Sequence, residues 1–392
     1  MNSDPLRAID IKQHNQNIIL SYIHSARNRG GISQSELVGL TGLKAPSVFR
    51  IFNALEEQEL IRPCEGAPTQ AAEAKKGRRP SYYTICPDAR YTIGVEFWAA
   101  CISLGVFNFN GDRIHSTQIN LSDWLSAEQI VDKIVLLIRS AIEVLGLDRS
   151  RIIGIGIAAP GKVDVKEGRI VFYHRISGMT NLPLKQELEK RLQLPVLVHN
   201  NCSAIAYYDY KYNAHEDNDS LFTFLFRSGV NGSMVSAGKI YVTSNGTTLE
   251  AGHLPISFDG PQCSCGLNGC LQAYMFELNK QFSQESDSLS LFQSLEKPLE
   301  NGDPKAIQIM EKASFYLYTA MKSVIRMLGP DSFLITSPNL GVANALRDGV
   351  IKLFENESDI FQASKPAVLA RQYDTMMAQR GASDLVLDRF FS

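Results

Sequence analysis

Three features that would place a chain in a simple functional class are absent from these 392 residues. No stretch is long and apolar enough to predict a membrane-spanning helix. The opening residues 1–5 have neither the basic start nor the apolar run of a signal peptide. Charge is nearly balanced, with 39 Lys and Arg against 41 Asp and Glu, so net charge predicts no class of partner. We therefore expect a cytoplasmic protein with no membrane partner.

Cysteine is also scarce, yet three of the seven cysteines lie within eight positions, at Cys263, Cys265 and Cys270. His253 precedes them in a segment rich in Gly and Pro, which predicts a loop. Three thiolates and one imidazole are the donors that tetrahedral Zn²⁺ favours, so residues 253–270 are expected to form a closed, structural zinc site. A disulfide is the alternative, but closely spaced cysteines suit its geometry poorly and the cytoplasm is reducing.

The first part of the chain has the pattern of a helix-turn-helix. Apolar side chains recur at helical spacing in residues 6–27. Ser33 and Glu36 form a capping box, which predicts a short helix ending at the turn around Gly42. A second helix is expected from Ala45, with a proline in its first turn. Helix, turn and helix in this order are typical of DNA-binding domains.

The second of these helices has an apolar face and a polar face. Four apolar residues repeat as i, i+3, i+4 and i+7 and are expected to face a core, namely Val48, Ile51, Phe52 and Leu55. Three polar residues on the other side are placed to meet base edges and phosphates in a major groove: Lys44, Ser47 and Arg50.

Two short strands, residues 60–62 and 82–85, follow the helices and enclose a basic tip, which makes the domain a winged one. Arg78 and Arg79 in the tip are expected to reach phosphates or a minor groove. Residues 1–86 are thus predicted to be a winged helix-turn-helix domain. The alternative is a small helical domain used for dimerisation.

Residues 87–392 change to strands alternating with helices. Three consecutive strands are expected between residues 91 and 119, followed by a helix at 127–145 and a strand at 151–158. Later strands at 221–226 and 332–336 indicate a second lobe. Such alternation predicts an α/β fold in two lobes, with ligands bound in the cleft between them.

Two motifs carry a resemblance to a known family. His253 with the Cys-x-Cys-Gly-x-x-Gly-Cys-Leu run from Cys263, and the Gly-Ile-Ala-Ala-Pro-Gly segment ending at Gly161, resemble the ROK family. The resemblance implies an actin/hexokinase-like fold. The family comprises bacterial sugar kinases and repressors descended from them. With its helix-turn-helix, the chain resembles the regulator branch, which includes N-acetylglucosamine and xylose repressors. It is thus expected to bind an operator and to sense a sugar or sugar phosphate.

The resemblance also implies a set of sugar-binding residues. Asn200, Glu250 and His253 match the family pattern, with His253 using one ring nitrogen for zinc and the other for a sugar hydroxyl. Asn201 stands where the kinases have their catalytic Asp, and an amide cannot act as a general base. Gln272 replaces a Glu. We therefore expect no enzyme activity, with sugar preference altered or sugar binding weakened.

The nucleotide side departs from the kinase pattern as well. Where the kinases have a Gly-rich phosphate turn, this chain reads Val95-Glu96-Phe97-Trp98-Ala99. A second phosphate loop is only partly kept at residues 228–232, and Ser337-Pro338 replaces a Gly pair. Glu96 would repel a phosphate and the two aromatic residues would crowd it.

Two alternatives to a sugar-sensing repressor stay open. One is an active sugar kinase with an appended DNA-binding domain, which the lost residues disfavour. The other is a regulator controlled by a protein partner, such as a sugar-transport component. Because one helix-turn-helix per chain reads a symmetric operator in pairs, a homodimer or homotetramer is expected.

Overall fold

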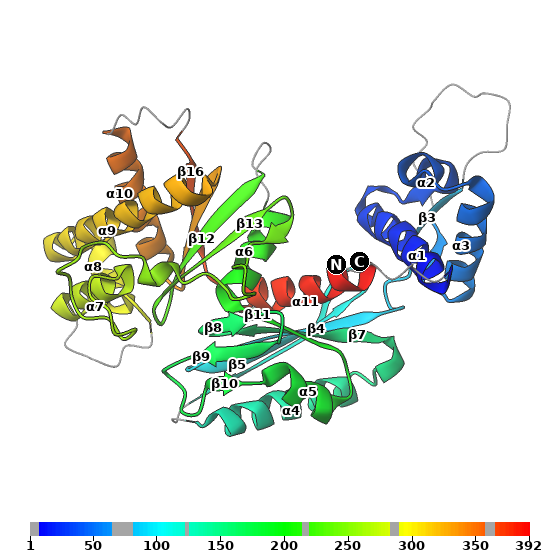
Figure 1. Cartoon of the computed structure of the whole chain (residues 1–392), viewed down its shortest axis with the longest axis horizontal. Helices are drawn as coiled ribbons and strands as arrows, with labels where there is room; N and C mark the ends of the chain where they lie inside the picture. Colours follow the sequence, from blue (N-terminus) through cyan, green and yellow to red (C-terminus); the bar gives the residue numbers. More distant parts are fainter. Residues whose placement is uncertain (1–7, 65–80, 122–124, 214–218, 283–289, 357–364) are drawn as a thin grey trace.

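The computed structural model of this chain describes residues 8–64, 81–121, 125–213, 219–282, 290–356 and 365–392 (Figure 1). It has a small helical domain beside two lobes, each built round a five-stranded sheet. The prediction of a winged helix-turn-helix in front of a two-lobed α/β fold is confirmed. Within the described ranges, no helix combines the length and apolar character needed to cross a membrane.

The small domain contains three helices and a three-stranded sheet of order β1-β3-β2. Its helices are α1 (Ala8–Ser25), α2 (Gln34–Thr41) and α3 (Ala45–Glu57). Its strands are β1 (Ile32–Ser33), β2 (Ile61–Pro63) and β3 (Tyr82–Ile85). Strand β1 was not predicted because two residues show no alternation. The turn η1 (Arg27–Arg29) joins α1 to β1.

Local sequence signals set the helix ends of this domain. The Ser33 hydroxyl accepts from the Glu36 amide, and the Glu36 carboxylate accepts from the Ser33 amide at 2.8 Å, which completes the predicted capping box. α2 ends at Gly42, whose φ of 66° lies in the left-handed region. The four apolar residues predicted for the inner face of α3 are all buried: Val48, Ile51, Phe52 and Leu55.

The first lobe has a sheet of order β11-β7-β4-β5-β6. Its antiparallel part is β4 (Tyr91–Trp98), β5 (Cys101–Asn108) and β6 (Arg113–Asn120). Its parallel part is β7 (Ile152–Ala159) and β11 (Val196–Asn200). Helices α4 (Ala127–Val144) and α5 (Leu184–Leu192) pack on the sheet through their apolar faces, and η2 (Arg149–Arg151) leads into β7. An unpredicted small sheet joins β8 (Lys162–Asp164), β9 (Arg169–Phe172) and β10 (Thr180–Leu182).

The second lobe repeats this arrangement, with a sheet of order β14-β13-β12-β15-β16. Its strands are β12 (Ser220–Phe226), β13 (Val230–Ser236), β14 (Lys239–Ile240), β15 (Ser332–Ser337) and β16 (Ala367–Gln372). Its helices are α7 (Leu271–Phe282), α8 (Glu296–Glu300), α9 (Pro304–Leu328) and α10 (Leu340–Glu355), with short turns η3 (Ala251–His253) and η4 (Gln293–Leu295). The repeated order of three antiparallel and two parallel strands gives both lobes one topology.

Two helices, α6 (Asn201–Tyr212) and α11 (Thr375–Phe391), lie between the sheets. α11 packs so closely on the first sheet that a Cβ added to Gly94 of β4 or Gly156 of β7 would overlap a carbonyl oxygen of the helix. The same holds between Gly381 of α11 and the Ala204 carbonyl of α6. Backbone therefore meets backbone along α11, which fixes its position on the first lobe.

The far end of α11 joins the core of the small domain, as Figure 1 shows for the red helix. Phe390 and Phe391 pack against that core, and the Asn17 side chain donates to the Phe390 carbonyl at 3.1 Å. Ala89 and Phe109 belong to the same core, so apolar packing continues across the domain boundary that we predict at residues 86 and 87.

Candidate metal centre and ligand cleft

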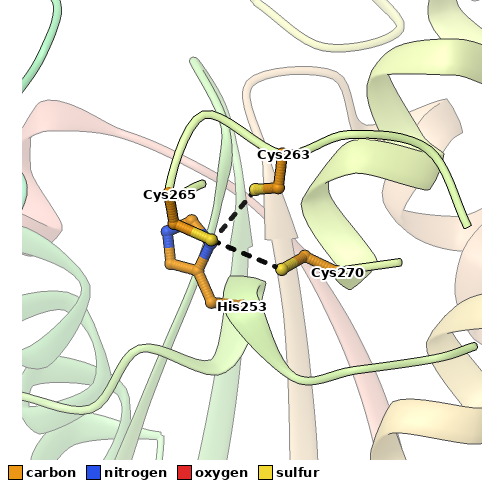
Figure 2. Close-up of side chains that lie close together, drawn as sticks. All are labelled: His253, Cys263, Cys265 and Cys270. Carbon is orange, nitrogen blue, oxygen red and sulfur yellow. Dashed lines mark hydrogen bonds between the residues drawn. The ribbon is translucent and has the colours of Figure 1, made fainter. Parts of the chain in front are cut away.

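Four side chains converge at the start of α7 (Figure 2). His253 comes from η3, while Cys263, Cys265 and Cys270 come from the loop that follows. The four ligand atoms lie within 4.8 Å of one another, with 3.3 Å from His253 Nδ1 to Cys263 Sγ. The sulfurs of Cys265 and Cys270 are 3.6 Å apart. Tetrahedral zinc with Zn–S bonds of about 2.3 Å separates its ligand atoms by roughly 3.5–3.8 Å. The predicted cluster is therefore present and fits such an ion.

Backbone hydrogen bonds shape the loop round the cluster. The Cys263 amide donates to the Leu267 carbonyl at 2.8 Å, and the Ile256 amide donates to the Gly269 carbonyl at 2.8 Å. Gly269 has a φ of 72°, and a Cβ there would overlap the Ser257 carbonyl oxygen. Glycine is therefore required at 269 for Cys270 to turn back towards the other sulfurs.

Burial sets the protonation of these ligands. It lowers the pKa of His253, which favours the neutral imidazole that binds metals. Burial, with the neighbouring Cys265 and Cys263, raises the pKa of Cys270 to about 12. A metal must therefore displace a proton from Cys270, so the affinity of the site for an ion should fall on acidification.

The second ring nitrogen of His253 faces away from the cluster. Its Nε2 lies 3.8 Å from a carboxylate oxygen of Glu250, while Nδ1 is on the cysteine side. Burial raises the pKa of Glu250 to about 7, and the nearby Lys162 partly opposes this. One imidazole thus links the metal cluster to the neighbouring carboxylate.

Asn200 and Asn201 lie where β11 passes into α6, and both are buried. The Asn200 amide donates to the Gly161 carbonyl at 2.6 Å, and its own carbonyl accepts from the Cys202 amide at 2.8 Å. The Asn201 side-chain carbonyl accepts from the same amide at 2.9 Å. Both side chains therefore cap α6, and Asn200 also fixes the Pro160-Gly161 turn.

Strand β8 connects these asparagines to Glu250. It begins at Lys162, directly after Gly161, and the Thr248 amide donates to the Val163 carbonyl at 3.0 Å. This pairing brings Lys162 near enough to Glu250 for its charge to act on the pKa of that carboxyl. Sequence reasoning missed Lys162, for which the signal was a charged residue directly after the Pro-Gly turn.

Gln272, in the first turn of α7, has a partner inside the second lobe. Its side-chain carbonyl accepts from the Val230 amide at 3.1 Å and lies against Gly229. Gln272 therefore holds the turn between β12 and β13, and its carbonyl oxygen is already engaged.

An ion pair occupies the segments that resemble phosphate loops. Arg227 Nη1 lies 2.6 Å from Glu96 Oε1, and the two side chains are 3% and 0% exposed. The guanidinium stacks on the rings of Trp98 and Tyr373, at 4.6 and 4.8 Å from the ring centroids. The Tyr373 hydroxyl donates to Glu96. Sequence reasoning missed Arg227, a lone charge at the end of the buried strand β12.

The predicted DNA-contacting residues of α3 face solvent to different degrees. Lys44 is the N-cap residue and is exposed, Ser47 is half-buried, and Arg50 is exposed with its Nε 3.4 Å from the Pro46 carbonyl. Arg78 and Arg79 lie outside the described residues.

Two lobes of one topology, a Cys₃His cluster at the start of α7 and a winged helix-turn-helix in front define a class: a sugar-kinase-type fold joined to a DNA-binding domain. The sequence pattern of the ROK family matches residues 92–389. This chain therefore belongs to the ROK family.

Relatives with assigned roles include both branches of that family. The xylose repressor of Bacillus subtilis (strain 168) is 24% identical over 386 residues, covering 97% of this chain and 96% of the relative. A glucokinase of Thermotoga maritima is 24% identical over 263 residues, covering 62% of this chain and 80% of the relative.

Solved structures bear out the fold. A ROK family transcriptional regulator described as a homologue of the E. coli MLC protein gives a TM-score of 0.78 at 19% identity, covering 96% of this chain and 97% of that one. A glucokinase from Streptomyces griseus, in complex with glucose and AMPPNP, gives 0.65 at 24% identity over 76% of this chain and 99% of that one.

Proposed function

We propose that this protein is a transcriptional repressor of genes for sugar uptake or catabolism. It binds an operator through its small domain and senses a sugar or sugar phosphate between its lobes, without phosphorylating it. The observation that carries the proposal is the union in one chain of an α3 with an exposed outer face and a kinase-type fold whose base position is Asn201. Similarity to a xylose repressor along 97% of the chain supports it.

DNA reading is assigned to the outer side of α3. Lys44 and Arg50 are exposed and carry positive charge, so they can contact phosphates or guanine edges when α3 enters a major groove. Ser47 lies between them on the same side. Arg78 and Arg79 are proposed to add phosphate or minor-groove contacts from the wing. Two copies of the chain, as a homodimer or homotetramer, would match a symmetric operator.

Sugar sensing is assigned to Asn200, Asn201, Glu250, His253 and Gln272. Glu250 and the Nε2 side of His253 lie together and offer an acceptor and an imidazole to sugar hydroxyls. The oxygens of both asparagines and of Gln272 already accept backbone amides, and the Asn200 NH₂ also donates to the Gly161 carbonyl. The donors left for a ligand are then the NH₂ groups of Asn201 and Gln272 and the second N–H of Asn200. The proposed sugar site then offers mainly hydrogen-bond donors, with the Glu250 carboxylate as its acceptor.

Phosphoryl transfer is not expected from this cleft. Asn201 has no basic oxygen with which to take a proton from a sugar hydroxyl. Its carbonyl is moreover engaged by the Cys202 amide. On the nucleotide side, the buried pair of Glu96 and Arg227 lies in the segments that resemble phosphate loops, where the carboxylate would repel a phosphate.

Zinc is the proposed ion of the metal centre, held by His253, Cys263, Cys265 and Cys270. The ion would be structural, because four protein ligands close its coordination shell. Its role would be to tie the loop to η3, which orients His253 towards Glu250.

A second candidate is control by a protein partner such as a sugar-transport component. The engagement of the Gln272 oxygen by Val230 favours it, because one sugar contact of the family pattern is then weakened. Titration calorimetry with a sugar panel separates the two, since only the first requires measurable sugar binding.

The DNA-binding part of the proposal is tested by selecting duplexes from a random pool on the full-length chain. A palindromic consensus bound by wild type, with loss of binding in Arg50→Ala, supports the proposal. Arg191→Met is a matched control, because it removes an arginine that pairs with Asp132 at 2.7 Å within the first lobe. No enrichment over several rounds would refute DNA reading by this chain.

A further inference from the structure

The ion pair between Glu96 and Arg227 joins the two lobes. Glu96 lies in β4 of the first lobe, and Arg227 directly follows β12 of the second. Both side chains are shielded from solvent. Ion pairs in such surroundings are screened little, and a partner left alone there is strongly destabilising. The contact therefore resists separation of the lobes at this point.

The surroundings of Arg227 hold it in one geometry. Its backbone amide donates to the Gly229 carbonyl at 3.0 Å, and its carbonyl accepts from the Leu291 amide at 2.6 Å. Trp98 and Tyr373 cover the guanidinium, and the Tyr373 hydroxyl gives Glu96 a second donor. We call these four side chains, Glu96, Trp98, Arg227 and Tyr373, the interlobe latch.

The latch lies where one turn from each lobe resembles a phosphate loop of the kinases, and it joins these two turns. A nucleotide in that position would present an anion to both turns. Here Glu96 supplies the anion and Arg227 its counter-charge, both from the chain itself.

We infer that Glu96 and Arg227 are positioning residues that replace a bound nucleotide: they fasten the lobes permanently on one side and set the position of α11, which carries the small domain. The inference rests on the proposed function in one respect, since the small domain is taken as the DNA-reading part.

The path from the latch to the small domain is continuous. Tyr373 belongs to the latch, and α11 begins two residues later. Backbone contacts at Gly94 and Gly156 fix α11 to the first sheet. At its other end Phe391 packs against His24 of α1, with ring centroids 5.2 Å apart. Because α11 is held along its length, a displacement of Tyr373 should shift the contacts of α11 with α1.

One consequence concerns the motion of the cleft. With the latch closed, the lobes are held together beside Glu96 by a buried ion pair. Near Glu250 they are joined instead by the hydrogen bonds between Val163 and Thr248 and by the charge of Lys162. A ligand at Glu250 would act on those contacts and alter the angle between the lobes without any nucleotide, while the latch keeps its position.

The test compares hydrogen exchange of the full-length chain, free of DNA and sugar, in wild type and three variants: Arg227→Met, Glu96→Gln/Arg227→Met and Tyr373→Phe. The first leaves a charge buried alone, the second removes both charges, and the third removes only one hydroxyl. Arg191→Met controls for the loss of an arginine from an ion pair, because its pair with Asp132 is partly exposed and lies within the first lobe.

The expected result is exchange at least tenfold faster in residues 226–231, at the start of α11 and in α1, with β7 and α9 unchanged. The double variant should regain most of the thermal midpoint lost by Arg227→Met, while its fast exchange in α1 persists. This difference separates a positioning role from a purely structural one, because a purely structural role would make the thermal midpoint and the slow exchange of α1 recover together. Tyr373→Phe should show the same pattern to a smaller extent, and the control none of it.

Faster exchange confined to residues 226–231, or spread evenly over the chain, would overturn the inference. Because DNA and sugar are absent, this outcome is independent of whether the chain is a repressor. A second measurement uses Glu96→Gly with inorganic phosphate at constant ionic strength. Phosphate should slow the exchange of α11 in this variant and leave wild type unaffected. Failure of phosphate to slow it would refute the replacement of a bound anion by Glu96.

Discussion

Acidification should loosen the junction between the small domain and the lobes, through His24. The His24 ring is buried there, and its Nε2 lies 3.0 Å from the Phe109 carbonyl. Since a carbonyl only accepts, Nε2 carries the proton, and Nδ1 is left to accept from Arg27 at 3.3 Å. Protonation of Nδ1 would therefore oppose the Arg27 guanidinium.

The size of the effect follows from the pKa of His24. Burial first, and then Arg27, Lys211 and Arg380, lower this pKa from 6.5 to about 3, against the raising effect of the Phe109 carbonyl. Because the folded-state pKa is depressed, the unfolded chain binds the proton more readily. The stabilising contribution is thus complete above pH 6.5 and is lost progressively as the pH falls towards 3. Linkage gives a loss of about 2 kcal/mol by pH 5.

The assay compares wild type with His24→Gln by urea unfolding at pH 8 and pH 5. A glutamine can donate to Phe109 and accept from Arg27, yet it does not titrate. Wild type should lose about 2 kcal/mol more than the variant between the two pH values. Histidine side-chain NMR gives the pKa directly, with the signal assigned by its absence from His24→Gln. A His24 that titrates near pH 6.5 would refute this reasoning.

Four further variants test the sites. Cys270→Ser should remove the proposed zinc and lower the thermal stability of the second lobe, and metal analysis giving no zinc in wild type purified without chelator would contradict the assignment. Asn201→Asp should give no sugar phosphorylation, because the carboxylate of Glu96, paired with Arg227, still lies in the segment that resembles a phosphate loop and would repel a phosphate; turnover above a no-enzyme control would refute this. Arg50→Ala should cost about 1–3 kcal/mol in operator binding and relax the preference for one base. Arg78→Ala/Arg79→Ala should weaken specific and non-specific DNA binding alike. Binding titrations at several salt concentrations distinguish these two outcomes. A loss of preference in the wing variant would instead place it in a minor groove.

Local patterns in the sequence predicted local structure well. The capping box at Ser33, the Gly42 turn and the buried face of α3 depend on residues a few positions apart. The metal cluster was predicted for the same reason, because three of its ligands lie within eight residues. Short strands without alternation, such as β1 and β8, give no comparable signal.

Contacts between distant residues were not predictable from one sequence. Glu96 was identified only as a residue that would repel phosphate, and nothing marked Arg227, 131 positions away, as its partner. Phe109 and His24 likewise meet only because α1 packs beside the end of β5. Family resemblance named Gln272 but could not reveal that its carbonyl binds Val230.

Under the proposed function, sugar bound between the lobes controls the affinity of the small domain for DNA. The most direct measurement is the affinity of the full-length protein for a duplex selected on it, with and without each sugar and sugar phosphate of a panel that includes xylose and glucose, in the absence of ATP. At least one compound should weaken binding tenfold or more, and Glu250→Gln should abolish this response while leaving sugar-free binding intact. An affinity unchanged by every compound, or a response that requires ATP, would contradict the proposed function.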